Sequence, residues 1–424
     1  MTTILIQETK ELTGQIEAPP SKSYTHRAII AASLADGKSR IRSPLLADDT
    51  IVTLNACASL GASITQRKIE LKIVGSSELK APTEAINCGD SASTIRFLTS
   101  IAALAKGRTV LDGSAGLRRR PIGPLIGALR ELGVQCTSNG DFPPVTVVGG
   151  TLRGGGASLV GDMSSQFVTG LLLACPLAEE DTEIVLTTPL ESKPYIRLTL
   201  DILKSHSIEV SASEDLRRFA IPCNQAYAPK DHDVPGDYSA AAFLLAAAAI
   251  TDSKATVKNL FSNQPDSEIV NILTMMGAQV KVEEKSVKVS GGKLRGITID
   301  ARDIPDLVPV CAVLACIAEG TTRIEEAGRL RIKESDRLST ISSELLKMDA
   351  DITEEAKGLT IRGPCVLRGA TIDPHGDHRV AMACAVAGLR AEGKTEILEA
   401  ECVNKSYPNF FRDLKRLGGR VRVG

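Results

Sequence analysis

Two hydroxyl residues and two cations stand at the start of a predicted helix near the N-terminus. The stretch Ser21-Lys22-Ser23 follows two prolines and precedes an apolar run. Because a residue that precedes a proline avoids the helical region, the helix should begin after Pro20, with Ser21 to Ser23 capping its free N–H groups. Lys22 and Arg27 then add positive charge to the positive end of the helix dipole, which is unfavourable unless an anion binds there. The stretch therefore indicates an anion site, although a solvated cap with two surface cations explains it equally well.

Arginines recur in the first turns of later predicted helices. Arg96 and Arg379 resemble Arg27 in following a polar start and preceding an apolar helix body. Guanidinium groups bind phosphate and carboxylate through paired hydrogen bonds, so they suit small anionic substrates. Further cations precede the outer helices in the stretches 117–121, 329–337 and 404–408. Pro121, in the first of these stretches, suits the first position of a helix. A single run of cations is usually a solvated face, but recurrence at corresponding places indicates a shared cationic cleft.

Two acidic residues, one at the start of a buried helix and one among these cations, are candidates for proton transfer. Asp306 stands at the start of a predicted buried helix, and Glu334 lies between Lys333 and Arg337. A carboxylate among cations usually stays ionised, so either residue could accept a proton from a substrate. For Glu334, a purely structural ion pair is the alternative. The sequence contains no Ser-His-Asp order, no P-loop and no metal-spaced cluster of His and Asp, so we expect no metal site.

The polar helix starts recur because the chain is built from repeats. A helix end followed by a strand, often written Leu-Gly, recurs near positions 61, 133, 207, 277, 349 and 418, about 70 residues apart. The buried helices begin near residues 21, 90, 164, 237, 306 and 377. Helices that are apolar almost all round must be buried, and the glycine suits a left-handed helix cap. Each repeat reads as strand, buried helix, strand, outer helix, strand, strand, which predicts an α/β protein of six βαβαββ units.

Chain length and two proline-bearing stretches predict how the repeats are divided. The chain has 424 residues, well above the roughly 250–300 at which a single core stops growing. The linker candidates lie near residues 19–20 and 230–235. If the chain crosses between domains at both, one domain contains residues 1–18 and 235–424, and the other contains residues 21–229. Each domain would then hold three repeats.

Composition limits the partners that the protein could bind. Lys and Arg number 50 against 51 Asp and Glu, and the chain has five Tyr, eight Phe and no Trp. A neutral chain with few stacking aromatics is not typical of a nucleic-acid binder. The most apolar stretch, residues 240–250, is shorter than the roughly 20 residues that a membrane span needs. Ten cysteines without C-x-x-C or zinc spacing favour reduced thiols in the cytoplasm. We therefore expect a cytoplasmic protein with small polyanionic substrates and no nucleic-acid or membrane partner.

Taken together, the motifs resemble the 5-enolpyruvylshikimate-3-phosphate (EPSP) synthase family, the 3-phosphoshikimate 1-carboxyvinyltransferases. The resemblance runs nearly end to end and is carried by Pro20 to Arg27, Leu117 to Pro121, Ser164 to Gln166, Ser192 to Tyr195, Ile304 to Asp306, Arg331 to Arg337, Asp377 to Arg379, and Lys405. It implies two inverse-barrel-like domains, each of three βαβαββ repeats with buried parallel helices, and an active site in the cleft between them. It also implies a shikimate-pathway monomer that needs no cofactor or metal. The reaction would move the enolpyruvyl group of phosphoenolpyruvate to the 5-hydroxyl of shikimate 3-phosphate through a tetrahedral intermediate, releasing phosphate.

The resemblance further implies a role for each matching residue. Asp306 would accept the proton of the 5-hydroxyl, Glu334 would move the proton at the methylene carbon, and Lys22 would be the third catalytic residue. Shikimate 3-phosphate would be held by Lys22, Ser23, Arg27, Ser164, Ser165, Gln166, Ser192, Asp306 and Lys333. Phosphoenolpyruvate would be held by Lys22, Ala92, Arg120, Gln166, Arg337, Arg379 and Lys405.

Three positions depart from the family's pattern. Ala92 replaces the usual glycine, Asp90 replaces the usual asparagine, and Arg329 stands where bacterial relatives often carry a substrate-contacting asparagine. The role of Arg329 therefore stays open. The extra methyl group of Ala92 would narrow the phosphoenolpyruvate pocket, so we predict weak inhibition by glyphosate, which occupies that space.

Two other functions compete with this interpretation. The sister enolpyruvyl transferase acting on UDP-N-acetylglucosamine shares the fold, but it usually carries a cysteine in the loop before the Arg-Pro pair. Residues 112–120 contain no cysteine here, and the sister enzyme also lacks the Pro-Ser-Lys-Ser start. A non-catalytic repeat protein that binds phosphate or nucleic acid is the alternative from another class. Neutral charge, few aromatics and interior acids count against it.

Overall fold

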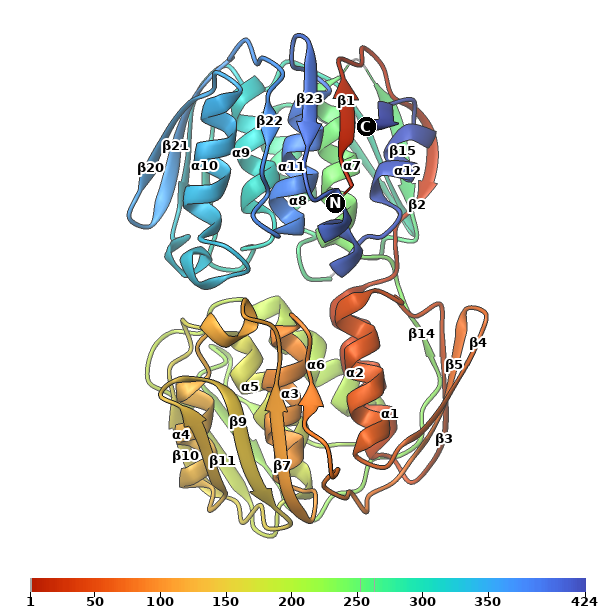
Figure 1. Cartoon of the computed structure of the whole chain (residues 1–424), viewed down its shortest axis with the longest axis vertical. Helices are drawn as coiled ribbons and strands as arrows, with labels where there is room; N and C mark the ends of the chain where they lie inside the picture. The colour runs from red at the N-terminus through yellow and green to blue at the C-terminus, as the bar shows by residue number, and fades with distance from the viewer. Residues whose placement is uncertain (1, 252, 263) are drawn as a thin grey trace. The chain divides into compact units, whose positions relative to one another are not determined.

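The computed structural model describes residues 2–251, 253–262 and 264–424, so residue 1 of the predicted segment 1–18 lies outside it. The chain divides into two compact units (Figure 1). Unit 1 is formed by Met1–Pro19 and Pro235–Gly424, and unit 2 by Pro20–Val234.

Within the residues that the structure describes, six four-stranded sheets, one for each repeat, form the framework of the two units. In each sheet the first strand pairs in parallel with the second, the second pairs antiparallel with the last, and the third forms the other edge; the pairing of β6, β7, β9 and β8 is one example. One buried and one outer helix connect these strands. The predicted order of strand, buried helix, strand, outer helix, strand, strand is confirmed.

Unit 2 contains the first three repeats. The first consists of β14 (His232–Asp233), α1 (Lys22–Leu34), β3 (Gly37–Arg42), α2 (Asp48–Ser59), β4 (Ser63–Arg67) and β5 (Glu70–Gly75). The second consists of β6 (Ile86–Asn87), α3 (Ala92–Ala102), β7 (Gly107–Asp112), η1 (Leu117–Arg119), α4 (Gly123–Glu131), β8 (Gln135–Asn139) and β9 (Phe142–Gly149). The third consists of β10 (Gly155–Leu159), α5 (Ser165–Ala174), η2 (Cys175–Leu177), β11 (Thr182–Leu186), α6 (Lys193–Ser205), β12 (Ser211–Ala212) and β13 (Arg218–Ile221).

Unit 1 contains the other three repeats. The fourth consists of β2 (Thr13–Glu17), α7 (Tyr238–Ile250), β15 (Lys254–Lys258), α8 (Ile269–Met276), β16 (Gln279–Glu283) and β17 (Ser286–Ser290). The fifth consists of β18 (Thr298–Asp300), α9 (Val308–Ile317), β19 (Gly320–Glu325), η3 (Gly328–Ile332), α10 (Arg337–Lys347), β20 (Asp351–Glu355) and β21 (Gly358–Gly363). The sixth consists of β22 (Thr371–Ile372), α11 (His378–Gly388), β23 (Lys394–Ile397), η4 (Ala400–Lys405), α12 (Phe410–Arg416), β24 (Arg420–Val423) and β1 (Ile4–Gln7).

Three strands complete sheets whose other strands are distant in sequence. β14 pairs in parallel with β3, with His232 opposite Ile41. β2 pairs in parallel with β15, and β1 lies between β23 and β24 in an antiparallel arrangement. The N-terminal strand therefore serves as the last strand of the sixth repeat, so the two ends of the chain close one sheet.

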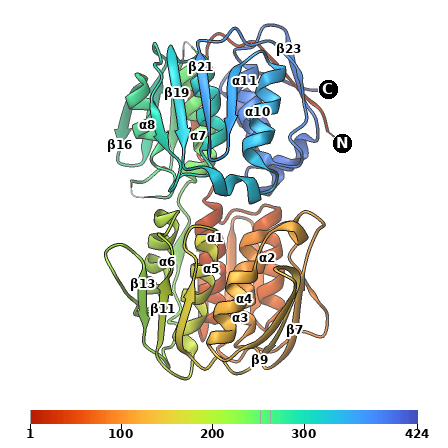
Figure 2. The ribbon, with the colours of Figure 1, turned by 90° about the vertical axis from the view of Figure 1, so that its left-hand side faces the viewer.

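Apolar helices form the interior of each unit. Unit 2 is built around α1, α3 and α5, with strands such as β7, β9, β11 and β13 outside them (Figure 2). Unit 1 is built around α7, α9 and α11, which are labelled in Figure 1. Every residue of α7 is buried, as the apolar composition of that segment predicts. Full burial of one Leu or Ile side chain contributes about 1.5–3 kcal/mol, so these helices supply much of each unit's stability.

Glycine lets the last strand of a repeat approach the carbonyl end of its buried helix. A Cβ atom at Gly75 would lie 2.3 Å from the carbonyl oxygen of Ala32, which is too close for any side chain. The same close approach recurs at Gly149 and Gly363. The repeats therefore share a packing requirement as well as an order of elements.

Most predicted helix starts coincide with observed caps. Ser21, Ser164, Asp237 and Asp377 are N-caps whose side chains accept a backbone N–H. The start predicted near residue 90 is capped by Ser91, and α9 starts at residue 308, after the predicted Asp306. The prediction for Pro121 is wrong: η1 precedes it, and the proline in the first turn of α4 is Pro124 instead. None of the helices in the described part of the chain is long and apolar enough to cross a membrane.

Candidate active site

The residues predicted from the sequence lie at the N-terminal ends of buried helices and in loops or helices nearby, some in each unit. Unit 1 contains Asp306, Lys333, Glu334, Arg337, Arg379 and Lys405. Unit 2 contains Lys22, Ser23, Arg27, Ala92, Arg120, Ser164, Ser165, Gln166 and Ser192.

In unit 1, three carboxylates surround the guanidinium group of Arg337. Its Nη1 donates to Asp306 Oδ1 at 2.9 Å and its Nη2 to Glu334 Oε2 at 2.8 Å. Its Nε donates to Asp377 Oδ2 at 2.9 Å, and the side chain is only 1% exposed. Burial alone would lower the pKa of Arg337, but the three negative charges together raise it above its usual range. Arg337 is therefore a fixed cation whose position depends on all three acids.

Arg379 and Lys405 bind the same acids from other elements. Arg379 Nη2 donates to Asp306 Oδ2 at 3.1 Å, and Lys405 Nζ lies 3.6 Å from Glu334 Oε1. With Arg337 and the three acids, they form a six-residue group of three cations and three anions, which we call the unit 1 ion network. Within it the side chain of Asp306 is 24% exposed, that of Glu334 10% and that of Asp377 0%. Asp306 is thus the acid that an incoming substrate reaches most readily.

Asp377 ties this network to the start of α11. Besides binding Arg337, its Oδ1 accepts the backbone N–H of Arg379 at 2.9 Å, and its Oδ2 accepts the Ser335 hydroxyl at 3.3 Å. The sequence identified Asp377 only as a helix start. The arginine two residues after this cap was the available signal that the aspartate has a second role.

Arginines in the first turns of three buried helices each lie against a phenylalanine ring of another buried helix. The pairs are Arg27 with Phe97, Arg96 with Phe167 and Arg379 with Phe243, with 4.9 to 5.9 Å between guanidinium carbon and ring centroid. An aromatic face stabilises a cation while leaving the N–H groups in the guanidinium plane available for acceptors. The sequence predicted where these arginines stand along the helices, but it did not predict the rings that orient them.

In unit 2, Arg96 holds two of the predicted substrate-binding residues. Its Nη1 donates to Ser164 Oγ at 3.2 Å and to Gln166 Oε1 at 2.9 Å, while its Nη2 donates to the Pro121 carbonyl at 2.9 Å. Gln166 Nε2 donates in turn to Ser93 Oγ at 2.8 Å. Arg96 therefore fixes the start of α5 relative to α3 and to the loop that carries Arg120. It was singled out in the sequence by its position but was not assigned to the site.

Lys22 pairs with an acid that the sequence did not identify. Its Nζ donates to Asp49 Oδ2 at 3.0 Å, and the two side chains are 13% and 6% exposed. Asp49 lies in the first turn of α2, where a carboxylate also stabilises the positive end of the helix. The pair holds the ammonium group in place at the start of α1.

Arg27 is buried and makes four hydrogen bonds within unit 2, at 2.8 to 3.2 Å. The acceptors are the carbonyl oxygens of Ser23 and Tyr195 and the hydroxyl oxygens of Thr169 and Thr199. Burial lowers the pKa of Arg27 to about 10, so it stays charged at neutral pH. These contacts connect α1 to α5 and α6.

Other predicted residues of unit 2 also lie at or beside helix starts. Ser165 and Ala92 are the first residues of α5 and α3, and both are buried, as is Arg120 after η1. Ser192 caps α6 in a left-handed conformation, with φ at 59°. Non-glycine residues in this conformation are strained and often occur at functional sites.

Some cations of the predicted cationic stretches lie in exposed or partly exposed ion pairs instead. Arg118 pairs with Asp112, and Arg331 pairs with Asp336 at 2.9 Å and with Glu354 at 2.7 Å. Arg118 and Arg331 therefore have acidic partners within their own units, and the expectation of one shared cationic cleft stays a prediction. Arg329 donates a hydrogen bond to the backbone carbonyl of Arg302, which gives it a structural contact.

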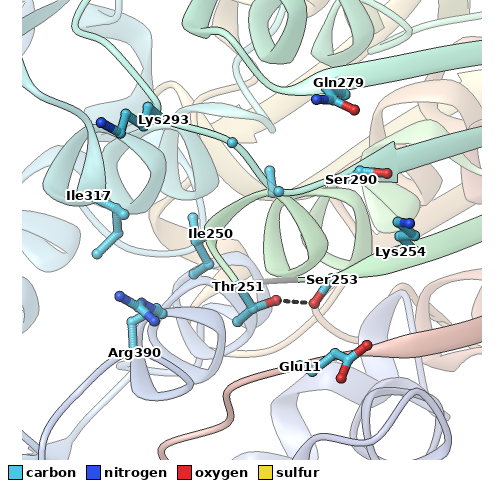
Figure 3. Close-up of a pocket in the computed structure, with 13 residues that line it drawn as sticks. Glu11, Ile250, Thr251, Ser253, Lys254, Gln279, Ser290, Lys293, Ile317 and Arg390 are labelled. Atoms are coloured by element: carbon cyan, nitrogen blue, oxygen red, sulfur yellow. Dashed lines mark hydrogen bonds between the residues drawn. The ribbon is translucent and has the colours of Figure 1, made fainter.

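A cavity of about 760 Å³ in unit 1 lies at the other end of the buried helices (Figure 3). It is lined by Ile250 at the end of α7, Ile317 at the end of α9 and Arg390 just beyond α11. The unit 1 ion network involves the opposite, N-terminal ends of these helices, so the cavity is separate from it. Lys254, Lys293 and Arg390 in its lining complement the partial negative charge of the helix C-termini.

No group of three or more His, Cys, Asp or Glu residues within residues 2–251, 253–262 and 264–424 could hold a metal ion. The charged groups at the helix starts instead define a class of protein that binds small molecules carrying phosphate and carboxylate, with acids placed to exchange protons. Comparison with known proteins narrows this class. A sequence model of the EPSP synthase (3-phosphoshikimate 1-carboxyvinyltransferase) family matches residues 6–414, and the chain belongs to that family.

Similar proteins agree along the whole chain. A 3-phosphoshikimate 1-carboxyvinyltransferase from Methanocaldococcus jannaschii is 45% identical over 427 residues, which cover 99% of both chains. One from Methanocella arvoryzae is 46% identical over 415 residues, covering 97% of each. The solved structure of an EPSP synthase from Acinetobacter baumannii matches with a TM-score of 0.87 and 29% identity, covering 100% of both chains. The predicted inverse-barrel α/β fold, the transferase class and enolpyruvyl transfer from phosphoenolpyruvate to shikimate 3-phosphate are thereby confirmed.

Proposed function

We propose that residues of both units act on one pair of substrates. The two substrates carry two phosphates and two carboxylates, so cations from more than one helix start are needed to hold them. The observation that carries the proposal is Asp306 bridging Arg337 and Arg379, because it places a partly exposed acid between two buried cations.

Each substrate is assigned its own set of side chains. Shikimate 3-phosphate is held by Lys22, Ser23, Arg27, Ser164, Ser165, Gln166, Ser192, Asp306 and Lys333. Phosphoenolpyruvate is held by Lys22, Ala92, Arg120, Gln166, Arg337, Arg379 and Lys405. Arg96 supports this assignment, since it positions Ser164 and Gln166 through hydrogen bonds of 3.2 and 2.9 Å.

Asp306 acts first as an internal counter-ion and then as a base. Its two oxygens accept hydrogen bonds from Arg337 at 2.9 Å and from Arg379 at 3.1 Å. The carboxylate of phosphoenolpyruvate offers the same two oxygens and displaces it from both arginines. The displaced carboxylate of Asp306 then accepts the proton of the substrate's 5-hydroxyl.

The acids then move protons in two steps. In the addition step the 5-oxygen bonds to C2 of phosphoenolpyruvate while a proton is added to its methylene carbon, which gives the tetrahedral intermediate. In the elimination step the new methyl group loses a proton and the C2–O bond to phosphate breaks. Glu334 in its protonated form delivers the proton to the methylene carbon, and the carboxylate that results, next to the cations Arg337 and Lys405, takes a proton back from the methyl group in the elimination step. Lys22 neutralises the charge that develops on the leaving phosphate.

The test measures phosphate release from phosphoenolpyruvate, with shikimate 3-phosphate or UDP-N-acetylglucosamine as acceptor. Release should require shikimate 3-phosphate. Asp306→Ala should lose most turnover while binding phosphoenolpyruvate as tightly as the wild type or more so, because its internal competitor is gone. Weaker phosphoenolpyruvate binding in Asp306→Ala would instead mean that the aspartate serves to position the arginines. Unchanged turnover would remove it from catalysis.

We also propose that the protein is a cytoplasmic monomer. All ten cysteines lie in the described part of the chain and none is in a disulfide, which suits a reducing compartment. Light scattering coupled to size-exclusion chromatography tests the oligomeric state, and a mass of two chains would refute the monomer.

A further inference from the structure

Two cysteines form a thiol pair at the C-terminal end of α9. Cys316 is the next-to-last residue of the helix and is fully buried, whereas Cys365 follows β21 and is partly exposed. The backbone N–H of Cys365 donates to the carbonyl oxygen of Cys316 at 2.7 Å. Their thiols lie close enough for each to shift the pKa of the other. The backbones are therefore in direct contact and the thiols are neighbours, as a disulfide requires.

The surroundings make the two thiols chemically different. The Cys365 sulfur accepts the backbone N–H of Asp351 at 3.4 Å. The hydrogen bond from Cys316 lowers the pKa of Cys365 to about 6, against the opposing effects of burial and of the Asp351 charge. The same bond, together with burial, raises the pKa of Cys316. The Cys365 thiol also donates to the carbonyl oxygen of Arg362 at 3.1 Å, and its lowered pKa makes it the member of the pair that loses its proton more readily.

Cys365 differs from the other cysteines in this respect. Among the ten, all of which belong to the described chain, it is the only one whose pKa is lowered. Cys223 and Cys402 are also partly exposed, but their pKa values are raised. The thiolate is the reactive form of cysteine, so an oxidant should select Cys365 over these two.

We propose that Cys316 and Cys365 form a reversible disulfide when the protein meets a peroxide. The Cys365 thiolate attacks one oxygen of hydrogen peroxide, breaking the O–O bond and releasing hydroxide, which takes up a proton to become water. Cys365 is thereby oxidised to a sulfenic acid while the peroxide is reduced. The Cys316 sulfur then attacks the Cys365 sulfur, the S–S bond forms, and the sulfenic hydroxyl leaves with the Cys316 proton as a second water. One peroxide thus oxidises two thiols and yields two waters.

The disulfide would close a loop that carries half of the active-site acids and cations of unit 1. Residues 316–365 include η3 and α10, and with them Lys333, Glu334 and Arg337. A cross-link restrains the unfolded chain, so the oxidised protein should melt at a higher temperature. Asp306 lies at the other end of α9, a helix of ten residues and about 15 Å, so turnover should be unchanged.

The experiment treats the reduced full-length protein with hydrogen peroxide, blocks remaining thiols and maps the peptides by mass spectrometry. The expected product has lost two hydrogen atoms, contains the Cys316 and Cys365 peptides joined, and returns to the starting mass with dithiothreitol. In Cys316→Ser, Cys365 should stop at the sulfenic acid, which dimedone traps. Cys365→Ser should form no linkage, and Cys223→Ser, which removes a partly exposed cysteine of raised pKa, should behave as wild type.

Three results would overturn the proposal. The first is a linkage between Cys316 and Cys384, whose charge also influences Cys316 from α11. The second is oxidation that reaches Cys223 or Cys402 before Cys365. The third is a Cys365 alkylation rate whose dependence on pH has the same midpoint in wild type as in Cys316→Ala, which lacks a donor at this position, because the Cys316 thiol would then have no effect on Cys365.

Discussion

Replacing Asp377 with asparagine tests whether the unit 1 ion network is held together by balanced charge. The substitution keeps the shape of the side chain, and asparagine caps a helix about as well as aspartate. It removes one of the three negative charges of the unit 1 ion network and leaves those of Asp306 and Glu334 in place. The change therefore isolates the charge of Asp377 from its capping role.

The expected cost follows from burial. Asp377 is 0% exposed and Arg337 is 1% exposed, so water cannot replace the lost partner. Removing one member of a buried ion pair typically costs about 3–5 kcal/mol. We expect a loss of this size in the free energy of unfolding of unit 1, with a fall in turnover because Arg337 loses a buried charged partner.

Urea unfolding followed by circular dichroism measures this loss. Asp336→Asn is the matched control, because Asp336 caps α10 and pairs with Arg331 at 2.9 Å but is 39% exposed. Exposed ion pairs contribute about 0–1 kcal/mol, so the control should change little. If Asp377→Asn costs no more than Asp336→Asn, the network does not depend on its balanced charge and the reasoning is refuted.

Three further predictions concern unit 2. Burial lowers the pKa of His26 to about 3 and that of His232 to about 4 in the folded chain, whereas in the unfolded chain both have pKa values near 6.5. Below about pH 6.5 the unfolded chain therefore binds protons that the folded chain does not. The free energy of unfolding should keep its full value above that pH. Between about pH 6.5 and pH 4 it should fall by up to about 1.4 kcal/mol for each pH unit and each of the two histidines. Urea midpoints from pH 7.5 to 4.5 check this, with the exposed His375→Gln as control; a flat profile would count against it. Gly75→Ala should destabilise unit 2, because the new Cβ atom would meet a carbonyl oxygen. Gly127→Ala lies inside α4 with open space around it and should stabilise unit 2 by about 1 kcal/mol. Equal melting temperatures of the two variants would contradict this. Glyphosate should inhibit the wild type weakly and Ala92→Gly more strongly, as measured by competition with phosphoenolpyruvate. Tight inhibition of the wild type would show that the Ala92 methyl group does not narrow the pocket.

Much of the framework could be predicted from the sequence because the signals are local. An apolar helix of thirteen residues such as α7 is stable only when it is buried. Ser21, Ser164 and Asp377 predict helix starts because serine and aspartate side chains accept the free N–H groups of a helix. The error at Pro121 also has a local cause, since a second proline three residues later fits the helix start better. Because the same signals recur about every 70 residues, the α/β repeat could be predicted without knowledge of which residues are in contact.

The site residues were named from the sequence through their match to a family, but their partners were not. Asp306 contacts Arg337 and Arg379, which lie 31 and 73 positions away, and Lys22 contacts Asp49 from a neighbouring helix. No local pattern determines such pairs, since they depend on how helices of different repeats pack side by side. The same holds for the rings beneath Arg27 and Arg96 and for the Cys316–Cys365 contact.

The sequence by itself determined the elements, their order, their buried faces and the places where charge is unfavourable without a ligand, because propensity, capping and hydrophobic periodicity act over a few residues. Only the tertiary structure decided which opposite charges meet. The energy of a buried ion pair depends on distance and on the exclusion of water, and both are set by packing between elements remote in the chain. For this reason the chain order shows three acids and three cations at scattered positions, while the folded unit 1 holds them as one balanced network around Arg337.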